Sequence, residues 1–199
     1  YQGCKVINRP DARNQCSGWI KIEKYYSILN TFYKMKIISG IIIFPIFFSC
    51  VSKTNIYLVR HAEKLNKEVE SPLSEDGKLR AQELTYIMRS KKIDDIYSSD
   101  YIRTKETVKP LGNILHKQIE LYKTDSSSLI LLSNKLISSR GKNFLVVGHS
   151  NTIPIMIKQL TNKKVIIEDG EYDKLFKITI KYRKKQKVFL KIKKFGNSN

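Results

Sequence analysis

The stretch "YLVRHAEK" (residues 57–64) decides the fold. Residues 56–59 form a continuous apolar run, as expected of a central strand in a parallel sheet, and Arg60-His61 follows it directly. The stretch "FLVVGHSNT" (144–152) repeats the pattern, because an apolar run there ends at Gly148-His149. The chain has only three histidines, and two of them stand at the ends of such strands.

Short apolar runs and helical patterns alternate from Thr54 onward, which indicates an α/β layered domain. Strands are expected at 56–59, 93–99, 119–122 and 144–147, with helices after Ser74 and over 103–115, 129–139 and 153–160. Pro110 should kink or restart the second helix. The last two runs, "LFKITIKYRKK" (175–185) and "VFLKIKKF" (188–195), alternate with period two and predict an antiparallel hairpin.

Polar residues follow the strands at their carboxyl ends, where open α/β sheets bind ligands. Arg60-His61, Ser98-Ser99 and Gly148-His149 each stand there, with Arg103 close by. Arginine suits phosphate oxygens, and a neutral histidine can attack phosphorus. A carboxylic acid is wanted to protonate the leaving oxygen. No carboxylate cluster or His/Cys spacing suggests a metal, so the sequence predicts phosphoryl chemistry without metal or cofactor.

Four motifs in order over residues 54–160 resemble the histidine phosphatase superfamily, which includes the phosphoglycerate mutases. They are "LVRHAEK", "PLSEDGKLRAQEL", "IYSSDYIRTKET" and "LVVGHSNTIP". The resemblance implies a three-layer α/β/α sandwich with a mainly parallel sheet. It also implies His61 as the phosphorylated nucleophile, with Arg60, Arg103 and His149 forming a phosphate pocket. The chain lacks long insertions, so it resembles the compact branch that includes small phosphohistidine phosphatases.

The general acid of this family normally lies between the second arginine and the second histidine. Glu120 and Asp125 are the candidates here, and Asp125 is preferred because it follows a predicted strand end. The alternative role for Asp125 is to cap the helix that begins near Ser126. Glu63 is expected to orient its loop or to pair with Arg60, and residues 171–173 could fold back toward the pocket rim.

The segment before the domain reads as a targeting sequence. Met35-Lys36 opens onto "IISGIIIFPIFFSC" (37–50), which is short for a membrane span, and Ser49-Cys50 resembles a bacterial lipobox with Cys50 as the lipidated residue. We therefore expect 1–34 to be upstream sequence, 35–50 to be a signal peptide and 51–199 to be the domain. The alternatives are an uncleaved anchor or a buried apolar segment.

Charge is strongly positive, at +19, and residues 174–194 contain ten Lys or Arg and no acid. Solvated strand faces explain such a run most simply, although a basic body would also gain attraction to an anionic membrane. No groove-reading motif accompanies the run, so nucleic acid is not expected as a partner. The expected location is the bacterial cell envelope, as a membrane-anchored lipoprotein facing outside the cytoplasm, with the cytoplasm as the alternative.

These features predict a phosphoric monoester hydrolase of the histidine acid phosphatase type that acts on a small phosphorylated substrate. Two alternatives use the same residues: a phosphohistidine phosphatase and a phosphoglycerate-mutase-like phosphotransferase. An alternative of another class is a lipid-tethered module that binds phosphorylated ligands with little activity.

Overall fold

The computed structural model describes residues 52–183 and 185–196. The predicted upstream segment 1–34, the signal segment 35–50 and its Cys50 lie outside these described residues. None of the described helices is both long and apolar enough to cross a membrane.

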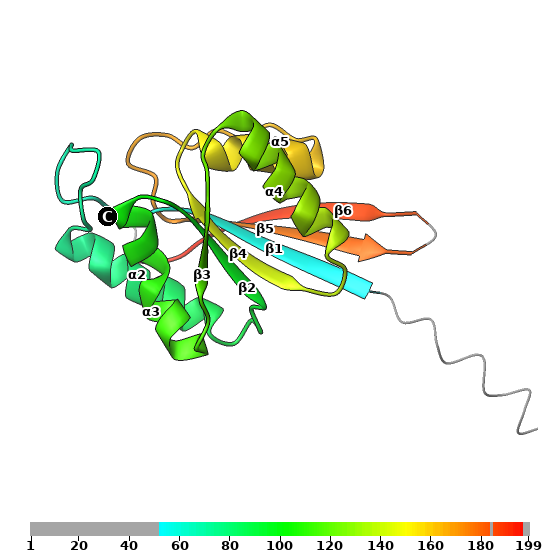
Figure 1. Cartoon of the computed structure of the whole chain (residues 1–199), viewed down its shortest axis with the longest axis horizontal. Coiled ribbons are helices and arrows are strands. Elements are labelled where there is room, and N and C mark those ends of the chain that lie inside the picture. Colours follow the sequence, from blue (N-terminus) through cyan, green and yellow to red (C-terminus); the bar gives the residue numbers. More distant parts are fainter. Residues whose placement is uncertain (1–51, 184, 197–199) are drawn as a thin grey trace, which may run out of the picture. The chain divides into compact units, whose positions relative to one another are not determined.

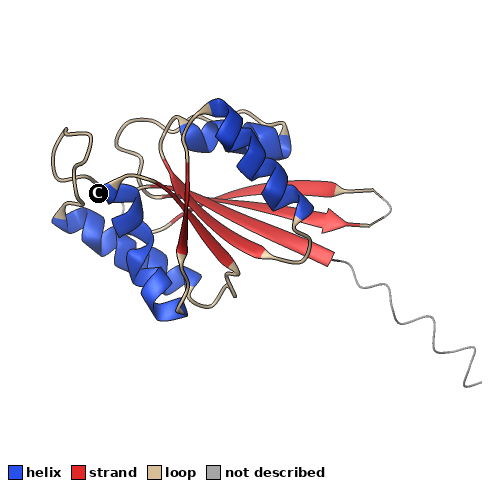
Figure 2. Ribbon diagram, in the orientation of Figure 1, coloured by secondary structure: helices blue, strands red, loops and turns tan. Residues whose placement is uncertain are grey.

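A six-stranded sheet forms the centre of the domain, in the order β3-β2-β4-β1-β5-β6 (Figure 2). Four strands run parallel: β1 (Ser52–Arg60), β2 (Asp95–Ser99), β3 (Ile119–Tyr122) and β4 (Asn143–Gly148). The hairpin of β5 (Lys174–Tyr182) and β6 (Lys187–Lys194) adds two antiparallel strands beside β1. The predicted mainly parallel sheet with a C-terminal antiparallel hairpin is therefore confirmed.

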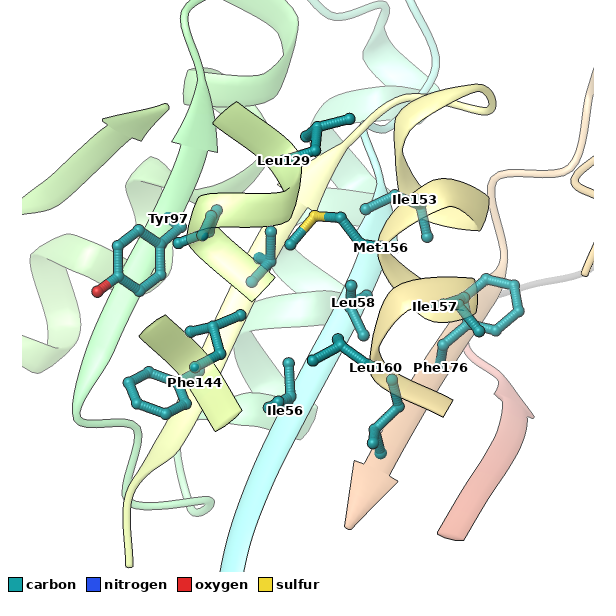
Figure 3. Packing of buried hydrophobic residues seen from close by; sticks show 14 of the residues in the cluster. Ile56, Leu58, Tyr97, Leu129, Phe144, Ile153, Met156, Ile157, Leu160 and Phe176 are labelled. Carbon is teal, nitrogen blue, oxygen red and sulfur yellow. The ribbon is translucent and has the colours of Figure 1, made fainter. Parts of the chain in front are cut away.

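Helices cover both faces of the sheet, which completes the predicted three-layer α/β/α sandwich (Figure 1). Helices α2 (Glu75–Met88) and α3 (Ile102–Leu115) lie on one face, and α4 (Ser126–Ser138) and α5 (Thr152–Thr161) lie on the other. Successive residues of β1 point to opposite faces, so Ile56 and Leu58 enter one core while Tyr57 and Val59 enter the other. Figure 3 shows the first core, where α4 and α5 pack on the sheet.

The helix starts follow from capping chemistry. Ser74 caps α2 as predicted, since its side chain accepts a hydrogen bond from the backbone N–H of Gly77.

The predicted restart at Pro110 is wrong, because α3 runs without interruption from Ile102 to Leu115. Proline costs that helix one backbone hydrogen bond. Val108 and Leu111, on either side of it, are fully buried, and this packing keeps the helix continuous.

Candidate active site

Neighbouring parallel strands bring the polar strand ends to one place. Arg60 at the end of β1 is level with Gly148 at the end of β4, and Ser98 of β2 is level with Val147 of β4. The His61 N–H donates to the Gly148 carbonyl across 2.9 Å, which fixes the chain as it leaves β1. As a result, the His61 and His149 rings lie edge to face with centroids 5.3 Å apart. The structure therefore joins the two strand-end histidines in one site.

A pocket of about 440 Å³ opens at this edge of the sheet, and we call it the two-histidine pocket. Its lining is basic and polar: Arg60, His61, Lys64, Tyr101, Arg103, Thr124, His149, Ser150, Asn151 and Thr152. No carboxylate lines it within residues 52–183 and 185–196. Such a lining suits a compact anion with several negative oxygens.

Gly148 lets the β4 end and α5 approach closely. A Cβ built on Gly148 would lie 2.6 Å from the Tyr122 hydroxyl and 2.8 Å from Thr152 Oγ1. Thr152 Oγ1 in turn accepts a hydrogen bond from the His149 N–H across 2.9 Å. The glycine thus allows the turn into α5 that holds the His149 backbone beside β1.

The tautomer of His61 follows from its hydrogen bond. Nδ1 lies 2.7 Å from the Ala62 carbonyl, which can only accept, so Nδ1 carries the proton and Nε2 keeps its lone pair. The Ala62 N–H is held in turn by Thr107 Oγ1 at 2.9 Å. Burial lowers the pKa of His61 from 6.5 to about 3, and the charges of His149, Arg103 and Arg60 add to this, against the hydrogen bond to Ala62. The ring is therefore neutral at pH 7 and free to act as a nucleophile.

His149 is held by a directional chain of hydrogen bonds. Arg103 Nη2 faces His149 Nδ1 at 3.3 Å, and because a guanidinium only donates, Nδ1 accepts and Nε2 carries the proton. That proton points to Ser99 Oγ at 2.8 Å, and the Ser99 hydroxyl donates to Thr104 Oγ1 at 3.1 Å. Burial, reinforced by Arg103 and Arg60, lowers the pKa of His149 to about 4. The empty pocket thus contains two neutral histidines.

Arg60 is buried and held in place by the loop that precedes β5. Its Nη1 donates to the Glu168 carbonyl across 2.9 Å, its Nη2 lies 3.7 Å from Asp169 Oδ1, and its guanidinium stacks 4.3 Å from the Tyr172 ring centroid. The rim prediction for residues 171–173 holds for Tyr172, whose ring lies 5.8 Å from that of His61. Glu171 and Asp173 pair instead with Lys174 and Lys194.

Arg103 comes from the first turn of α3. Its Nη1 donates to the Val69 carbonyl, and its guanidinium lies 4.6 Å from the Tyr101 ring centroid. The Nε atoms of Arg103 and Arg60 are both buried without a hydrogen-bond partner among the described residues. Each arginine at the pocket therefore keeps one unused donor.

The structure does not bring the predicted acid, Asp125, into the pocket. Asp125 is the N-cap of α4 and accepts from Ser128 N at 2.9 Å, so the alternative role is the one observed. Its hydrogen bonds to Ser127 and then Ser128 lower the pKa of its carboxyl, and it lines a hollow of about 680 Å³ that adjoins the two-histidine pocket and shares Tyr101 and Thr124 with it. Glu120 is exposed and pairs with Lys135. A carboxylate that is held ionised outside the pocket is poorly suited to donate a proton there.

Glu63 does not pair with Arg60, which corrects that prediction. Its carboxylate binds Arg80 of α2, with Arg80 Nε 2.7 Å from Oε1 and Nη2 2.6 Å from the same oxygen. The Glu63 carbonyl accepts from Ser74 N, and a Cβ on Gly77 would come within 2.2 Å of that carbonyl. Glu63 therefore anchors the loop after His61 to the start of α2, which is the orienting role predicted as its alternative.

Comparisons with known proteins agree with this geometry. Residues 56–124 match the histidine phosphatase superfamily (branch 1). That segment contains Arg60, His61 and Arg103 and the first three of the four motifs, and it ends before His149. No curated protein sequence matches the chain.

Solved structures share the fold at low identity. A mycobacterial glucosyl-3-phosphoglycerate phosphatase is 12% identical, with a TM-score of 0.54 over 64% of this chain and 91% of its own. A phosphoserine phosphatase from Entamoeba histolytica, solved with 3-phosphoglyceric acid, is 16% identical with a TM-score of 0.52 over 73% and 98%. The protein histidine phosphatase SixA, solved with tungstate, is 17% identical with a TM-score of 0.50 over 66% and 95%. These likenesses establish the fold.

Sequence reasoning missed the residues that hold the pocket rather than line it. Thr107 fixes the Ala62 backbone and the 168–172 loop covers Arg60, yet neither looks like a chemical group in the sequence. Thr107 does stand within the "IYSSDYIRTKET" motif, which is the one signal that could have found it.

Among the described residues, no group of three or more His, Cys, Asp or Glu side chains gathers as a metal site.

Proposed function

We propose that this protein is a metal-independent phosphatase that hydrolyses a phosphate monoester through a phosphohistidine intermediate on His61. The observation that carries the proposal is the neutral His61, with its Nε2 lone pair free and two arginine side chains at the same pocket. The match of residues 56–124 to the histidine phosphatase superfamily supports it. The structural neighbours, phosphatases by their names, have the same fold.

The proposed reaction has two displacements. His61 Nε2 forms a bond to phosphorus as the bond from phosphorus to the leaving oxygen breaks, and water then attacks phosphorus to release inorganic phosphate and the neutral histidine. Arg60 and Arg103 hold the phosphoryl oxygens and balance the charge that spreads over them. His149, whose Nδ1 faces Arg103 Nη2, gains a proton more easily once a phosphate dianion is bound and then donates to it.

No carboxylate lines the two-histidine pocket in the described part of the chain, so the proposed reaction assigns no side chain as donor of the leaving-group proton. We therefore expect turnover to depend steeply on the acidity of the leaving group. Aryl phosphates should react faster than alkyl phosphates. This feature also favours the phosphohistidine alternative, since a protonated imidazole is a good leaving group.

The test is hydrolysis of p-nitrophenyl phosphate by the purified full-length chain in the presence of a chelator. We expect turnover with the wild type and a loss of at least about 1000-fold for His61→Asn, which removes the nucleophile while keeping a polar side chain of similar size. Rapid quenching should trap a phosphoenzyme in the wild type, seen by intact-mass spectrometry and absent from His61→Asn. The matched control is His116→Asn, which changes the histidine outside the pocket and should keep full activity.

A wild type that binds phosphate but turns over no faster than His61→Asn would replace this proposal with the binding module. Product transfer to a second substrate in place of water would favour the phosphotransferase. The envelope location and lipidation of Cys50 are separate proposals, supported by the apolar stretch that ends in Ser49-Cys50. Palmitate labelling of the wild type, lost in Cys50→Ala, tests them.

A further inference from the structure

The outer half of the sheet has one face that the described helices leave open. Helix α3 packs over β2, β3 and β4 on this face and α2 packs against α3, while the hairpin of β5 and β6 extends beyond them (Figure 1). Alternate residues of β1, β5 and β6 point to this open side. The set comprises Lys53, Lys177, Lys181, Lys187, Phe189, Lys191 and Lys193, and we call it the lysine face.

Strand register places like charges opposite one another on the lysine face. Lys53 pairs with Lys181, and Lys181 pairs with Lys187, so three ammonium groups share one row across three strands. Lys177 and Lys191 are also directly opposite. Like charges at such positions destabilise a sheet. An external anionic surface would relieve this repulsion.

No acid within the described chain offsets these charges. The three strands contain no Asp or Glu, and none of the six lysines has a carboxylate within salt-bridge distance in residues 52–183 and 185–196. By contrast, Lys174 and Lys194, at the other end of the hairpin, are both paired with acids. The unpaired charge is therefore concentrated on one face and toward the hairpin tip.

The aromatic content of the face is also suited to a lipid interface. Phe189 lies between the lysine rows with 48% of its surface exposed, and Lys181 Nζ lies 5.1 Å from its ring centroid. An exposed aromatic ring flanked by ammonium groups fits the level of phospholipid headgroups, where rings insert while lysines meet phosphates. The face contains no arginine, although arginine is the residue that grips nucleic-acid phosphates and bases bidentately.

The chain enters the sheet beside this face. Ser52, the first residue of β1, pairs with Tyr182 at the tip of the hairpin, and the apolar stretch 37–49 precedes it in sequence. The two-histidine pocket lies at the opposite end of β1, whose nine residues span roughly 26 Å at about 3.3 Å per residue. Within the lysine face, the row of Lys53, Lys181 and Lys187 is farthest from the pocket, so a partner that covers the tip and this row leaves the pocket open.

From these observations we infer that the lysine face is a docking surface for an anionic phospholipid membrane, which holds the domain with its pocket toward the aqueous phase. The attraction is electrostatic and falls with salt, because exposed lysines near a charged surface are screened within a Debye length.

The experiment uses the full-length chain and vesicles of phosphatidylcholine, with or without phosphatidylglycerol. We expect the wild type to bind phosphatidylglycerol vesicles more tightly, in a manner that high salt abolishes. The triple variant Lys187→Gln/Lys191→Gln/Lys193→Gln should lose this binding by on the order of 100-fold, at about fivefold per lysine. Binding to pure phosphatidylcholine, through the apolar segment, should be equal in both proteins.

The matched control is Lys158→Gln/Lys163→Gln/Lys164→Gln, which removes the same charge from exposed positions in and just after α5, the helix on the other face of the sheet. It should bind as the wild type does. Equal binding of the β6 triple variant and the wild type to phosphatidylglycerol vesicles would overturn the proposal. So would a loss confined to DNA oligonucleotide binding, which would assign the face to nucleic acid. Unchanged hydrolysis of p-nitrophenyl phosphate and an unchanged melting curve confirm that the triple variant is folded.

Discussion

The two-histidine pocket and the lysine face are both strongly basic, but they hold their charge in opposite ways. In the pocket, Arg60 is 8% exposed, and each guanidinium is fixed by backbone carbonyls and an aromatic ring. On β6, Lys187, Lys191 and Lys193 are exposed and have no acidic partner among the described residues. The pocket selects its ligand by geometry, since buried donors in fixed directions recognise a particular anion. The lysine face acts through its charge, because flexible ammonium groups attract any nearby anionic surface.

This difference assigns the basic residues to separate tasks. Net charge alone, at +19, would attribute both regions to one anionic partner. The pocket lies at the carboxyl end of β1, whereas the row of Lys53, Lys181 and Lys187 lies at its beginning, so that changes in one should leave the other intact.

The largest effect is expected from substitutions that keep the charge but change its shape. Arg103→Lys should lower kcat/KM for p-nitrophenyl phosphate by on the order of 100-fold, because lysine cannot reproduce the fork that faces His149 and the pocket. The corresponding exchange on the hairpin, Lys191→Arg, should keep both vesicle binding and activity. Steady-state kinetics measures the activity of both variants, and vesicle flotation measures their membrane binding. Full activity in Arg103→Lys would mean that the pocket also works by charge alone.

A smaller effect is expected at Ser99. Its Oγ accepts a hydrogen bond from the His149 Nε2–H, and its hydroxyl donates one to Thr104 Oγ1. Ser99→Ala leaves that donor without its partner, and we expect a loss of about 1–3 kcal/mol in the free energy of unfolding and about 10-fold in kcat. Urea unfolding and steady-state kinetics give the two values. The control is Ser127→Ala, at an exposed position in the first turn of α4. Equal unfolding midpoints for Ser99→Ala and the wild type would show that His149 is held by other contacts.

The sequence predicted the residues that chemistry requires and missed those that only the fold brings near. His61 and His149 were found because each follows an apolar run, and the carboxyl ends of neighbouring parallel strands necessarily meet. Asp125 also follows a strand, but its short side chain can reach the backbone N–H of Ser128, and this local bond wins over a role in the pocket. Adjacency to a strand end therefore places a residue near the edge of the sheet without fixing where its side chain points.

The loop that holds Arg60 could not be predicted in the same way. Glu168 and Asp169 lie more than a hundred positions away in sequence, and their contact with Arg60 depends on how the chain returns from α5 to β5. Glu63 illustrates the same limit at shorter range. Its neighbour in sequence, Arg60, and its actual partner, Arg80, are equally good chemical matches, and only the packing of α2 decides between them.

Titration should also distinguish the two buried pocket histidines from a solvent-exposed histidine by their pKa values. Burial lowers the pKa of His61 to about 3 and that of His149 to about 4, so both should stay neutral through the range in which a free histidine titrates, near 6.5. Ring-proton NMR, assigned with His61→Asn and His149→Asn, should give midpoints below 5 without phosphate. Because the unfolded chain binds these protons first, stability should fall as the pH drops below about 6.5. A midpoint near 6.5 for either ring would mean that water reaches it freely.

The smallest effect concerns Asp169, the carboxylate 3.7 Å from Arg60 Nη2. Its side chain is fully exposed, so its attraction to Arg60 is screened by water, and removing it should barely change stability. It nevertheless places a negative charge beside Arg60, which is proposed to hold the substrate phosphate. Asp169→Asn should therefore lower KM for p-nitrophenyl phosphate by a few-fold, roughly the range of an exposed ion pair, with kcat unchanged. This decrease in KM should be smaller at high salt. A raised KM would instead show that Asp169 positions Arg60, and a lowered kcat would give this carboxylate a part in proton transfer to the leaving group.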